Sequence, residues 1–312
     1  MYPGAITEIE GIRVGHAQNT AAGTGVTALL FDGKAVCGVD VRGSAPGTRE
    51  TDGLDPVNHC DAVHGIALCG GSAFGLEAAY GIMQFLEERH IGFDTGFGKV
   101  PIVPGAVIFD LGYGSPNIRP DKKMGYEACQ NASSICPQGA IGAGTGATVG
   151  KLFGADHCEK SGLGTACIVL PNGVKVGALM VVNAFGDIFD DEQGKMIAGL
   201  RDDQGNLQNT VQTMLKQRQK VQGFGQNTTI GVVATDADLT KAQAKKMAQI
   251  GHDGYAMAIR PVHTMLDGDT LFGVSTGNKE CDFNILLAAA AKVVARGICN
   301  AIYSLALHKG EE

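Results

Sequence analysis

The stretch QNTTIGVVATDA, residues 226–237, places Asn227, Thr228 and Thr229 directly before an apolar run. A threonine hydroxyl is a weak nucleophile unless a base lies beside it, and one known solution uses the threonine's own α-amine. That amine has an ordinary pKa of about 7.7–8.0 and is therefore partly unprotonated at neutral pH. The solution requires Thr228 to become a chain terminus, by attack of its hydroxyl on the Asn227 carbonyl, an N-to-O acyl shift and hydrolysis of the ester. By itself, Asn-Thr-Thr also fits an N-cap or an ordinary turn.

A pair of carboxylates follows in Asp267-Gly268-Asp269-Thr270. If this segment is extended, the side chains at i and i+2 point to the same face. Two close carboxylates raise the pKa of one of them, and the pair can orient a hydroxyl or an amine. Asp-Gly is also a common turn signal, so both interpretations stay open. Asp269 leads into a predicted strand over residues 269–275, so an extended segment with both carboxylates on one face remains a possible arrangement.

Asn183 and Lys151 are two further polar candidates beside apolar or small residues. Asn183 ends the apolar run 179–182, where its amide could donate to a developing oxyanion or satisfy a turn. Lys151 ends the glycine-rich segment GAIGAGTGATVGK, residues 139–151. A lysine there can orient or charge-stabilise a substrate, or it can be an ordinary surface lysine.

The glycine-rich segment does not match the common nucleotide-binding patterns. A P-loop requires glycine where Thr145 stands and Ser or Thr where Leu152 stands. The glycines at 142 and 144 are not followed by the rest of the dinucleotide pattern. We therefore expect a tight turn that lines a site rather than a nucleotide cradle.

Composition narrows the function classes further. Of the 312 residues, 44% are hydrophobic and 18% charged, which is typical of a globular chain. The net charge of −7 without a Lys/Arg-rich block argues against nucleic-acid binding. Nine cysteines without C-x-x-C, and an N-terminus without an apolar segment, predict reduced thiols and a cytoplasmic chain. His and Cys spacing gives little support to a metal site, and we expect no metal and no other cofactor.

The elements that must position these residues can be read from turn signals and periodicity. We predict strands at 24–31, 35–41, 165–170, 174–182, 229–235 and 269–275, with hairpin turns at Asp32-Gly33 and Pro171-Asn172-Gly173. We predict helices from the N-cap Ser72 to residue 86, from Thr240 to His252, and over 283–307. The last is interrupted by charged and polar residues, which predicts a core helix rather than a membrane span. Residues 187–222 are polar, have helical character near 210–220, and predict a mobile linker.

Hairpin-paired strands and long helices, without regular βαβ alternation, predict an α+β layered sandwich. In it, antiparallel sheets carry helices on their outer faces.

Several blocks in order then resemble the DmpA-type family of L-aminopeptidase/D-esterases, β-peptidyl aminopeptidases and nylon-oligomer hydrolases. The blocks are ITEIEGIRVGH, RGSAPGTRETDGLDP, HGIALCGGSAFGLEAAYGI, GAIGAGTGATVGK and NTTIGVVATDADLTKAQ, and they span nearly the whole chain. The resemblance implies a four-layer αββα sandwich of the DmpA/ornithine-acetyltransferase type with mostly antiparallel sheets. It also implies a homotetramer of αβ units.

The resemblance assigns roles to residues of this chain. It implies self-cleavage at Asn227–Thr228 into an α chain, residues 1–227, and a β chain, residues 228–312, with Thr228 as the N-terminal nucleophile. Asn183 matches the oxyanion-hole asparagine. Asp267 and Asp269 match the Asp-x-Asp of the nylon-oligomer branch, whereas the β-aminopeptidase branch carries Ser-x-Glu there. The residues that match the substrate-lining positions are Lys151 and Tyr113, and we expect Gly144 and Thr145 of the glycine-rich loop to contact the substrate.

The function expected is that of a self-processing amidohydrolase or aminopeptidase that releases small N-terminal residues from peptides, amides or esters through an acyl-enzyme. Three alternatives stay open: a 6-aminohexanoate-type oligomer hydrolase, an ornithine-acetyltransferase-like acyl transferase, and a binding homologue that never cleaves. The expected partners are a small peptide or amide substrate and further copies of the chain, but neither nucleic acid nor a membrane.

Overall fold

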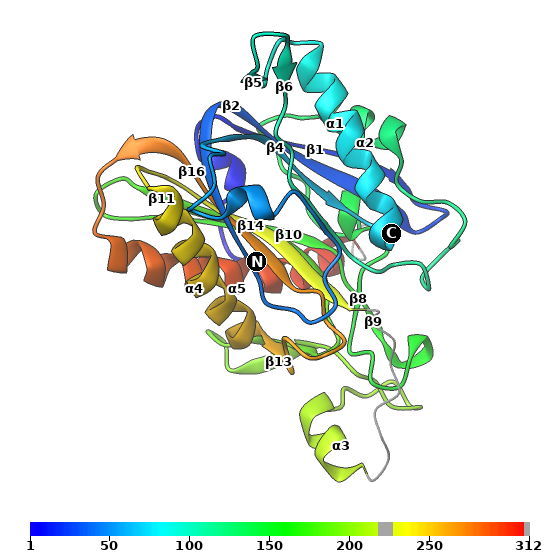
Figure 1. Cartoon of the computed structure of the whole chain (residues 1–312). Coiled ribbons are helices and arrows are strands. Elements are labelled where there is room, and N and C mark those ends of the chain that lie inside the picture. The colour runs from blue at the N-terminus through cyan, green and yellow to red at the C-terminus, as the bar shows by residue number, and fades with distance from the viewer. Residues whose placement is uncertain (218–226, 309–312) are drawn as a thin grey trace.

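Two sheets that share one long strand organise the chain, whose computed structural model describes residues 1–217 and 227–308 (Figure 1). The first sheet contains β1 (Ile12–Asn19), the first half of β2 (Thr24–Val41), β4 (Val63–Cys69), β7 (Gly105–Val107) and β3 (Thr48–Arg49). The second contains β10 (Leu163–Val169), β11 (Lys175–Asn183), β14 (Thr228–Ala237), β16 (Thr270–Lys279) and the second half of β2. Neighbours are antiparallel except β14–β16 and β4–β7, which are parallel.

Strand β2 corrects one prediction. The hairpin predicted at Asp32-Gly33 is wrong, because the chain continues straight through these residues. Residues 24–31 pair with β1, whereas residues 36–41 pair with β16 in the other sheet. A hairpin requires the two halves to pair with each other, and here each half finds a different partner. The strand therefore passes from one sheet into the other.

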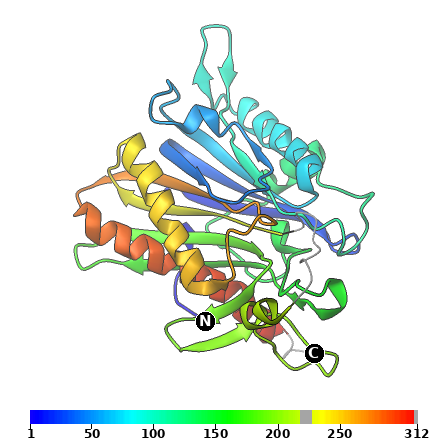
Figure 2. The same cartoon turned by 60° about the horizontal axis from the view of Figure 1, so that its bottom comes forward.

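Four helices cover the outer faces of the two sheets (Figures 1 and 2). Helices α1 (Ala78–Glu87) and α2 (Lys122–Gln130) pack on the first sheet, and α4 (Lys241–Ala258) and α5 (Phe283–His308) pack on the second. One apolar cluster lies between the two sheets. A second lies between the first sheet and its helices, and a third lies between the second sheet and its helices. The predicted four-layer αββα sandwich is confirmed.

Strand β14 lies in the middle of this sandwich. Ile230 and Val232 face the cluster between the sheets, while Val233 faces the cluster under α4 and α5. Every residue of the strand is buried. Burial on both faces explains why residues 230–234 read as an uninterrupted apolar run rather than as an alternation.

Local signals set several boundaries. Helix α4 begins after Thr240, whose hydroxyl accepts from the Gln243 backbone N–H while the Gln243 side chain accepts from the Thr240 N–H, a capping box. The predicted hairpin over residues 165–182 is confirmed as β10 and β11. Ser72 is not an N-cap: a short 3₁₀ helix, η3 (Ser72–Glu77), follows Gly71 without a side-chain cap, and only then does α1 begin.

The segment predicted as a mobile linker is largely ordered. It contains β12 (Asp187–Asp190), β13 (Lys195–Ala198) and α3 (Thr210–Lys216), while the predicted helical positions 218–220 lie outside the described residues. Strand β12 also pairs with β15 (Ile259–Arg260). Buried Asp187 accepts from the Leu200 and Thr210 backbone N–H groups and from the Thr210 hydroxyl, at 2.9, 2.6 and 2.6 Å. The prediction relied on the polar composition of the segment. The Asp187 carboxylate orders it instead, through hydrogen bonds to residues 13 and 23 positions further along the chain.

The remaining short elements lie in connections. Strands β5 (Phe93–Asp94) and β6 (Lys99–Val100) form a hairpin that projects beyond the layers in Figures 1 and 2. The others are β8 (Thr148–Val149), β9 (Glu159–Lys160), η1 (Ile6–Glu8), η2 (Asp52–Leu54), η4 (Gly142–Gly144) and η5 (Ala155–His157).

Helix α5 is the one described helix that, by length and composition alone, is apolar enough to cross a membrane, over Phe283–Leu307. In this fold it packs on β10, β11 and α4, and 56% of its most apolar window is buried. More than half of this window is thus part of the core, in agreement with the predicted core helix.

Candidate active site

Thr228 is the first residue of β14 and is almost fully buried. Its hydroxyl donates to the carbonyl oxygen of Asn227, the residue before it. The same carbonyl oxygen accepts from the backbone N–H of Gly268 at 3.0 Å, because Asn227 bridges in parallel to Asp267. Across the sheet, Thr228 lies opposite Asn183, the last residue of β11. The Asn227–Thr228 peptide is therefore held between two strands, and its carbonyl oxygen accepts two hydrogen bonds.

Asp267 and Asp269 lie on the other side of this peptide. Both are buried, and the turn of their loop falls at residues 265–266, so Asp267-Gly268-Asp269 is an extended lead into β16. Asp269 Oδ1 accepts from the Thr229 backbone N–H at 2.7 Å, and its Oδ2 lies 2.8 Å from His263 Nδ1. The extended interpretation of the carboxylate pair is the one the fold adopts.

The Asp267 carboxylate has its own set of donors. Its Oδ2 accepts from the backbone N–H and the hydroxyl of Thr264 at 2.9 and 2.5 Å, and its Oδ1 accepts from the Phe185 N–H at 3.4 Å. Burial, and next the nearby charge of Asp269, raise the pKa of Asp267 to about 6. A group with this pKa can accept a proton near neutral pH.

Asn183 and Lys151 form a pair beside Thr228. Lys151 Nζ donates to the Asn183 side-chain and backbone oxygens at 2.6 and 3.1 Å. The Asn183 side-chain oxygen also accepts from the Thr148 N–H at 3.1 Å, and its amide nitrogen donates to the Phe109 carbonyl at 2.9 Å. Burial lowers the pKa of Lys151 to about 7, so this lysine also changes charge near neutral pH.

A hollow of about 360 Å³ opens beside Lys151. Tyr113, half exposed, lines it, as do Lys160 and Cys158. Gly144 and Thr145 do not line this hollow: both are buried, and the Thr145 hydroxyl donates to the Gly142 carbonyl at 2.7 Å. The full lining is Phe109, Asp110, Gly112, Tyr113, Gly146, Thr148, Lys151, Gly154, Ala155, Cys158 and Lys160. The glycine-rich loop does reach the hollow, but through residues later than those predicted.

Sequence reasoning did not single out four polar residues here. Asp110 is buried and accepts from the Thr24 hydroxyl and the Gly71 N–H at 2.7 and 2.6 Å, and burial raises its pKa. Lys160 donates to three backbone carbonyls and lies 5.0 Å from the Tyr113 ring, and burial lowers its pKa to about 8. The other two are His263 and Thr264, whose one signal is that they precede the carboxylate pair by a few residues.

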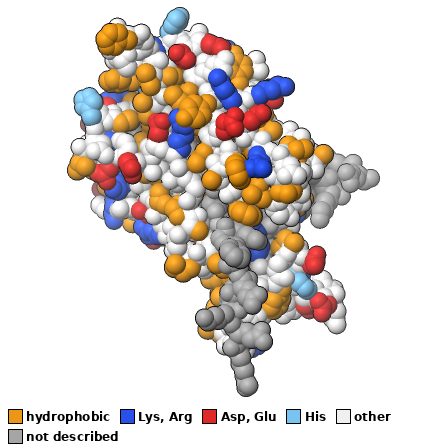
Figure 3. Space-filling model, turned by 45° about the vertical axis from the view of Figure 1, so that its right-hand side comes forward, with side chains coloured by type: hydrophobic (Ala, Val, Ile, Leu, Met, Phe, Trp, Pro, Cys, Tyr) orange, Lys and Arg blue, Asp and Glu red, His pale blue; other side chains and the backbone are white. Residues whose placement is uncertain are grey.

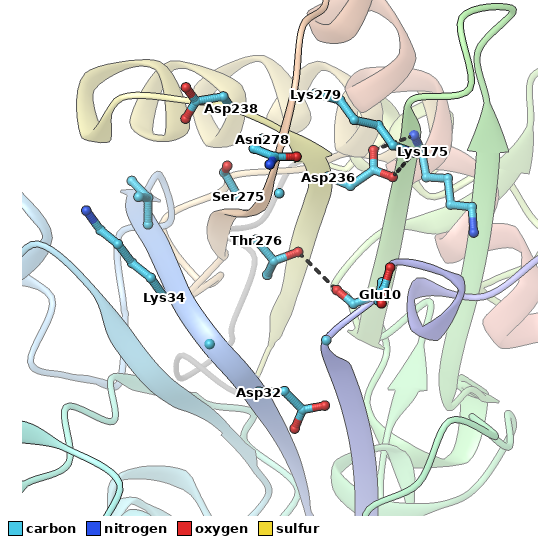
Figure 4. A pocket seen from close by; sticks show the side chains of 14 residues that line it. Glu10, Asp32, Lys34, Lys175, Asp236, Asp238, Ser275, Thr276, Asn278 and Lys279 are labelled. Atoms are coloured by element: carbon cyan, nitrogen blue, oxygen red, sulfur yellow. Dashed lines mark hydrogen bonds and ion pairs between the residues drawn. The ribbon is translucent and has the colours of Figure 1, made fainter.

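A second hollow, of about 560 Å³, lies at the other end of β14 (Figure 4). Asp236 and Asp238 line it, and ten residues of extended strand put it roughly 30 Å from Thr228. In its lining, Lys279 Nζ lies 2.8 Å from Asp236 Oδ2, and Lys175 Nζ donates to the Glu8 backbone carbonyl. This hollow is remote from the threonine and the carboxylate pair.

Charged side chains and metal-binding groups do not indicate a further site among the described residues. On the described part of the face in Figure 3, Lys and Arg side chains lie intermixed with Asp and Glu. Within residues 1–217 and 227–308, no group of three or more His, Cys, Asp or Glu side chains is placed to hold a metal ion. The site described above contains a hydroxyl, an amide, carboxylates and a lysine.

Comparison with known proteins defines the class. The model of peptidase family S58 matches residues 4–311, and the chain belongs to this family, the DmpA-type family that the sequence resembles. It is 43% identical over 300 residues to an uncharacterized aminopeptidase of Mycobacterium leprae, covering 88% of this chain and 79% of that one. It is 33% identical over 275 residues to a 6-aminohexanoate-oligomer endohydrolase of Kocuria sp., covering 86% and 74%.

A solved structure agrees with the fold. The L-aminopeptidase D-Ala-esterase/amidase of Ochrobactrum anthropi, described as a variant of the Ntn hydrolase fold, superimposes with a TM-score of 0.74. The match has 18% identity and covers 97% of this chain and 87% of that one. Family and relatives together identify the chain as a hydrolase of peptide or related amide bonds.

Proposed function

We propose that this hydrolase matures by cutting its own Asn227–Thr228 bond and then works as an N-terminal-threonine aminopeptidase. It releases small N-terminal residues from peptides, amides or esters. The α chain is residues 1–227 and the β chain is residues 228–312.

The observation that carries this proposal is the setting of the Asn227 carbonyl. Its oxygen accepts from the Gly268 N–H, and the Thr228 hydroxyl lies against it. A backbone N–H on that oxygen stabilises the negative charge that develops when a nucleophile adds to the carbonyl carbon. The parallel bridge between Asn227 and Asp267 supplies this N–H, so the strand pairing itself places a donor on the carbonyl oxygen of the bond to be cut.

The maturation step balances as an acyl shift followed by hydrolysis. Thr228 Oγ adds to the Asn227 carbonyl carbon and its proton passes to a base. The Thr228 nitrogen then takes up a proton as the C–N bond breaks, which leaves an ester between Asn227 and Thr228 Oγ. Water hydrolyses the ester to a carboxylate on Asn227 and a free amine and hydroxyl on Thr228. Asp267 and Lys151, with pKa values of about 6 and about 7, are the two groups suited to accept the first proton.

Hydrolysis of a substrate repeats this chemistry with the new amine as the base. Thr228 Oγ attacks the substrate carbonyl, the α-amine takes the hydroxyl proton, and the same proton goes to the leaving amine. Asn183 and backbone N–H groups hold the oxyanion, and Asp267 and Asp269 orient the Thr228 end of β14. Water then resolves the acyl-enzyme. The hollow of about 360 Å³ that is lined by Tyr113 and Lys160 provides space for the side chains of a substrate.

A second candidate is hydrolysis of 6-aminohexanoate-type oligomers. The observation in its favour is the Asp267/Asp269 pair, together with the Kocuria relative named for that activity. An ornithine-acetyltransferase-like transfer and a binding protein without cleavage are the remaining alternatives. A homotetramer of αβ units in the cytoplasm stays a prediction.

Two isosteric variants test the proposal. Thr228→Val removes the hydroxyl and keeps the shape. Thr229→Val is the matched control, because the buried Thr229 hydroxyl has no hydrogen-bond partner among the residues that the structure describes. Intact mass under denaturing conditions should show two species for the wild type and for Thr229→Val, but one full-length species for Thr228→Val. Hydrolysis of amino-acid anilides and aminohexanoate oligomers should vanish in Thr228→Val alone. Cleavage or hydrolysis that survives in this variant would overturn the assignment.

A further inference from the structure

The His263 side chain contacts Asp269, the carboxylate that accepts from the Thr229 N–H, but His263 has none of the roles assigned above. It belongs to the loop between β15 and β16, and its backbone has φ of 55°, a conformation rare outside glycine. Both its backbone N–H and its Nδ1 face Asp269 Oδ2, at 3.2 and 2.8 Å. A non-glycine residue held in this conformation with two donors on one oxygen indicates a site that depends on the contact.

The imidazole is fixed by its neighbours. Its side chain is 17% exposed, and its ring lies edge-on to His252 at 4.8 Å and tilted to Tyr255 at 5.6 Å, between ring centroids. His252 is itself anchored, with Nε2 3.1 Å from the Asp40 carbonyl oxygen. The Tyr255 hydroxyl lies 3.3 and 3.1 Å from the backbone carbonyls of Thr229 and Thr270. The three rings therefore brace the entrance of β14 against the start of β16.

The hydrogen-bond inventory selects one form of the ring. Nδ1 faces a carboxylate oxygen and therefore carries the hydrogen. His263 Nε2 is buried and has no partner among the described residues. A hydrogen on Nε2 would be a buried donor without an acceptor, so the neutral ring with its hydrogen on Nδ1 fits best.

We propose that His263 is a positioning residue: it fixes the Asp269 carboxylate, which in turn holds the Thr229 N–H and so sets where the Thr228 hydroxyl points. The inference rests on the proposed function, because it assumes that Thr228 is the nucleophile. Asp269 has two oxygens, and one of them already accepts from Thr229 at 2.7 Å. Without the Nδ1 donor, Asp269 Oδ2 keeps only the longer bond from the His263 backbone N–H, so the carboxylate holds the first peptide of β14 less firmly.

Three variants separate the donor from the ring. His263→Asn keeps a side-chain N–H near the position of Nδ1 but removes the ring, and asparagine tolerates positive φ. His263→Phe keeps the ring between His252 and Tyr255 but removes the donor. His263→Gly relieves the backbone conformation and leaves a space that free imidazole can enter. His59→Ala, at an exposed histidine, is the control for the loss of an imidazole elsewhere.

The measurements are the processing rate by intact mass, kcat and KM of the processed form, and the melting temperature. For His263→Phe we expect processing and kcat at least about tenfold lower with KM within about twofold, since one charge-assisted hydrogen bond is lost. His263→Asn should stay within about threefold of wild type, a difference well below one such bond. Added imidazole should restore His263→Gly in proportion to its concentration.

Wild-type rates in His263→Phe would overturn the inference. Equal losses in the Asn and Phe variants that follow the melting temperature, with no imidazole rescue, would also overturn it, because they indicate bracing of the fold alone. Thr228→Val keeps the two proposals apart. If that variant is inactive while His263→Phe is normal, only the present inference fails, whereas an active Thr228→Val removes the proposed function itself.

Discussion

A methyl group placed at Gly268 would meet the candidate nucleophile directly. An ideal Cβ on Gly268 lies 2.8 Å from Thr228 Oγ and 2.6 Å from the Ala45 carbonyl oxygen, whereas ordinary Cβ contacts begin at 3.4 Å. In Gly268→Ala the hydroxyl must therefore move by roughly 0.6 Å, and the Ala45 backbone must also give way. Since a displacement of about 1 Å at a reacting group costs about 100-fold in rate, we expect processing to slow by roughly tenfold or more.

Overpacking should also lower the free energy of unfolding by about 1–3 kcal/mol. Gly65→Ala provides a matched control, since an ideal Cβ there lies 2.9 Å from the Leu29 carbonyl oxygen, within the first sheet. The assay follows full-length precursor from cell-free synthesis by intact mass over time, with melting temperatures measured on both variants. We expect comparable destabilisation in the two, but slow processing only in Gly268→Ala. Wild-type processing in Gly268→Ala would refute the argument that the Thr228 hydroxyl acts from its observed position.

Two further predictions address proton transfer and the hollow. Burial raises the pKa of Asp267 to about 6 and lowers the pKa of Lys151 to about 7. Each group can act as a base only once it has lost its own proton, which happens as the pH rises. Processing should therefore accelerate from pH 5 and level off above about pH 7. Hydrolysis uses the new Thr228 amine, with an ordinary pKa of about 7.7–8.0, so its rate should still rise toward pH 8; parallel profiles for both reactions would contradict this separation. Iodoacetamide at the partly exposed Cys158 should block hydrolysis more than about tenfold in the wild type but not in Cys158→Ala, by filling a hollow of about 360 Å³. Unchanged turnover after complete alkylation would place the substrate elsewhere.

Much of the fold was predictable because its signals are local. The capping box at Thr240, the turn between β10 and β11, and the apolar run of β14 each lie within a few residues, where propensity and periodicity act. The family resemblance supplied the αββα architecture, which the three apolar clusters confirm. Thr228 and the Asp267/Asp269 pair were likewise visible in short stretches, although their roles stay predictions.

The candidate site itself contained residues that local patterns did not reveal. Asp110 and Lys160 sit in segments whose sequences give no chemical signal, and Asp110 meets its partner Thr24 from eighty-six positions away. His263 lies only six residues before its partner Asp269, but that spacing alone does not predict the contact. Gly144 lies in the glycine-rich loop but is buried and outside the lining of the hollow, and its contact with a substrate stays a prediction.

The sequence by itself thus determined most of the secondary structure, the family and the short motif around Thr228. Only the tertiary structure decided that β2 runs from one sheet into the other, and that the Asn227 carbonyl receives the N–H of Gly268, forty-one positions further along the chain. The physical reason is that strand pairing and side-chain convergence depend on contacts between residues far apart in sequence. Period and turn chemistry define an element, but they do not specify which other element satisfies its hydrogen bonds.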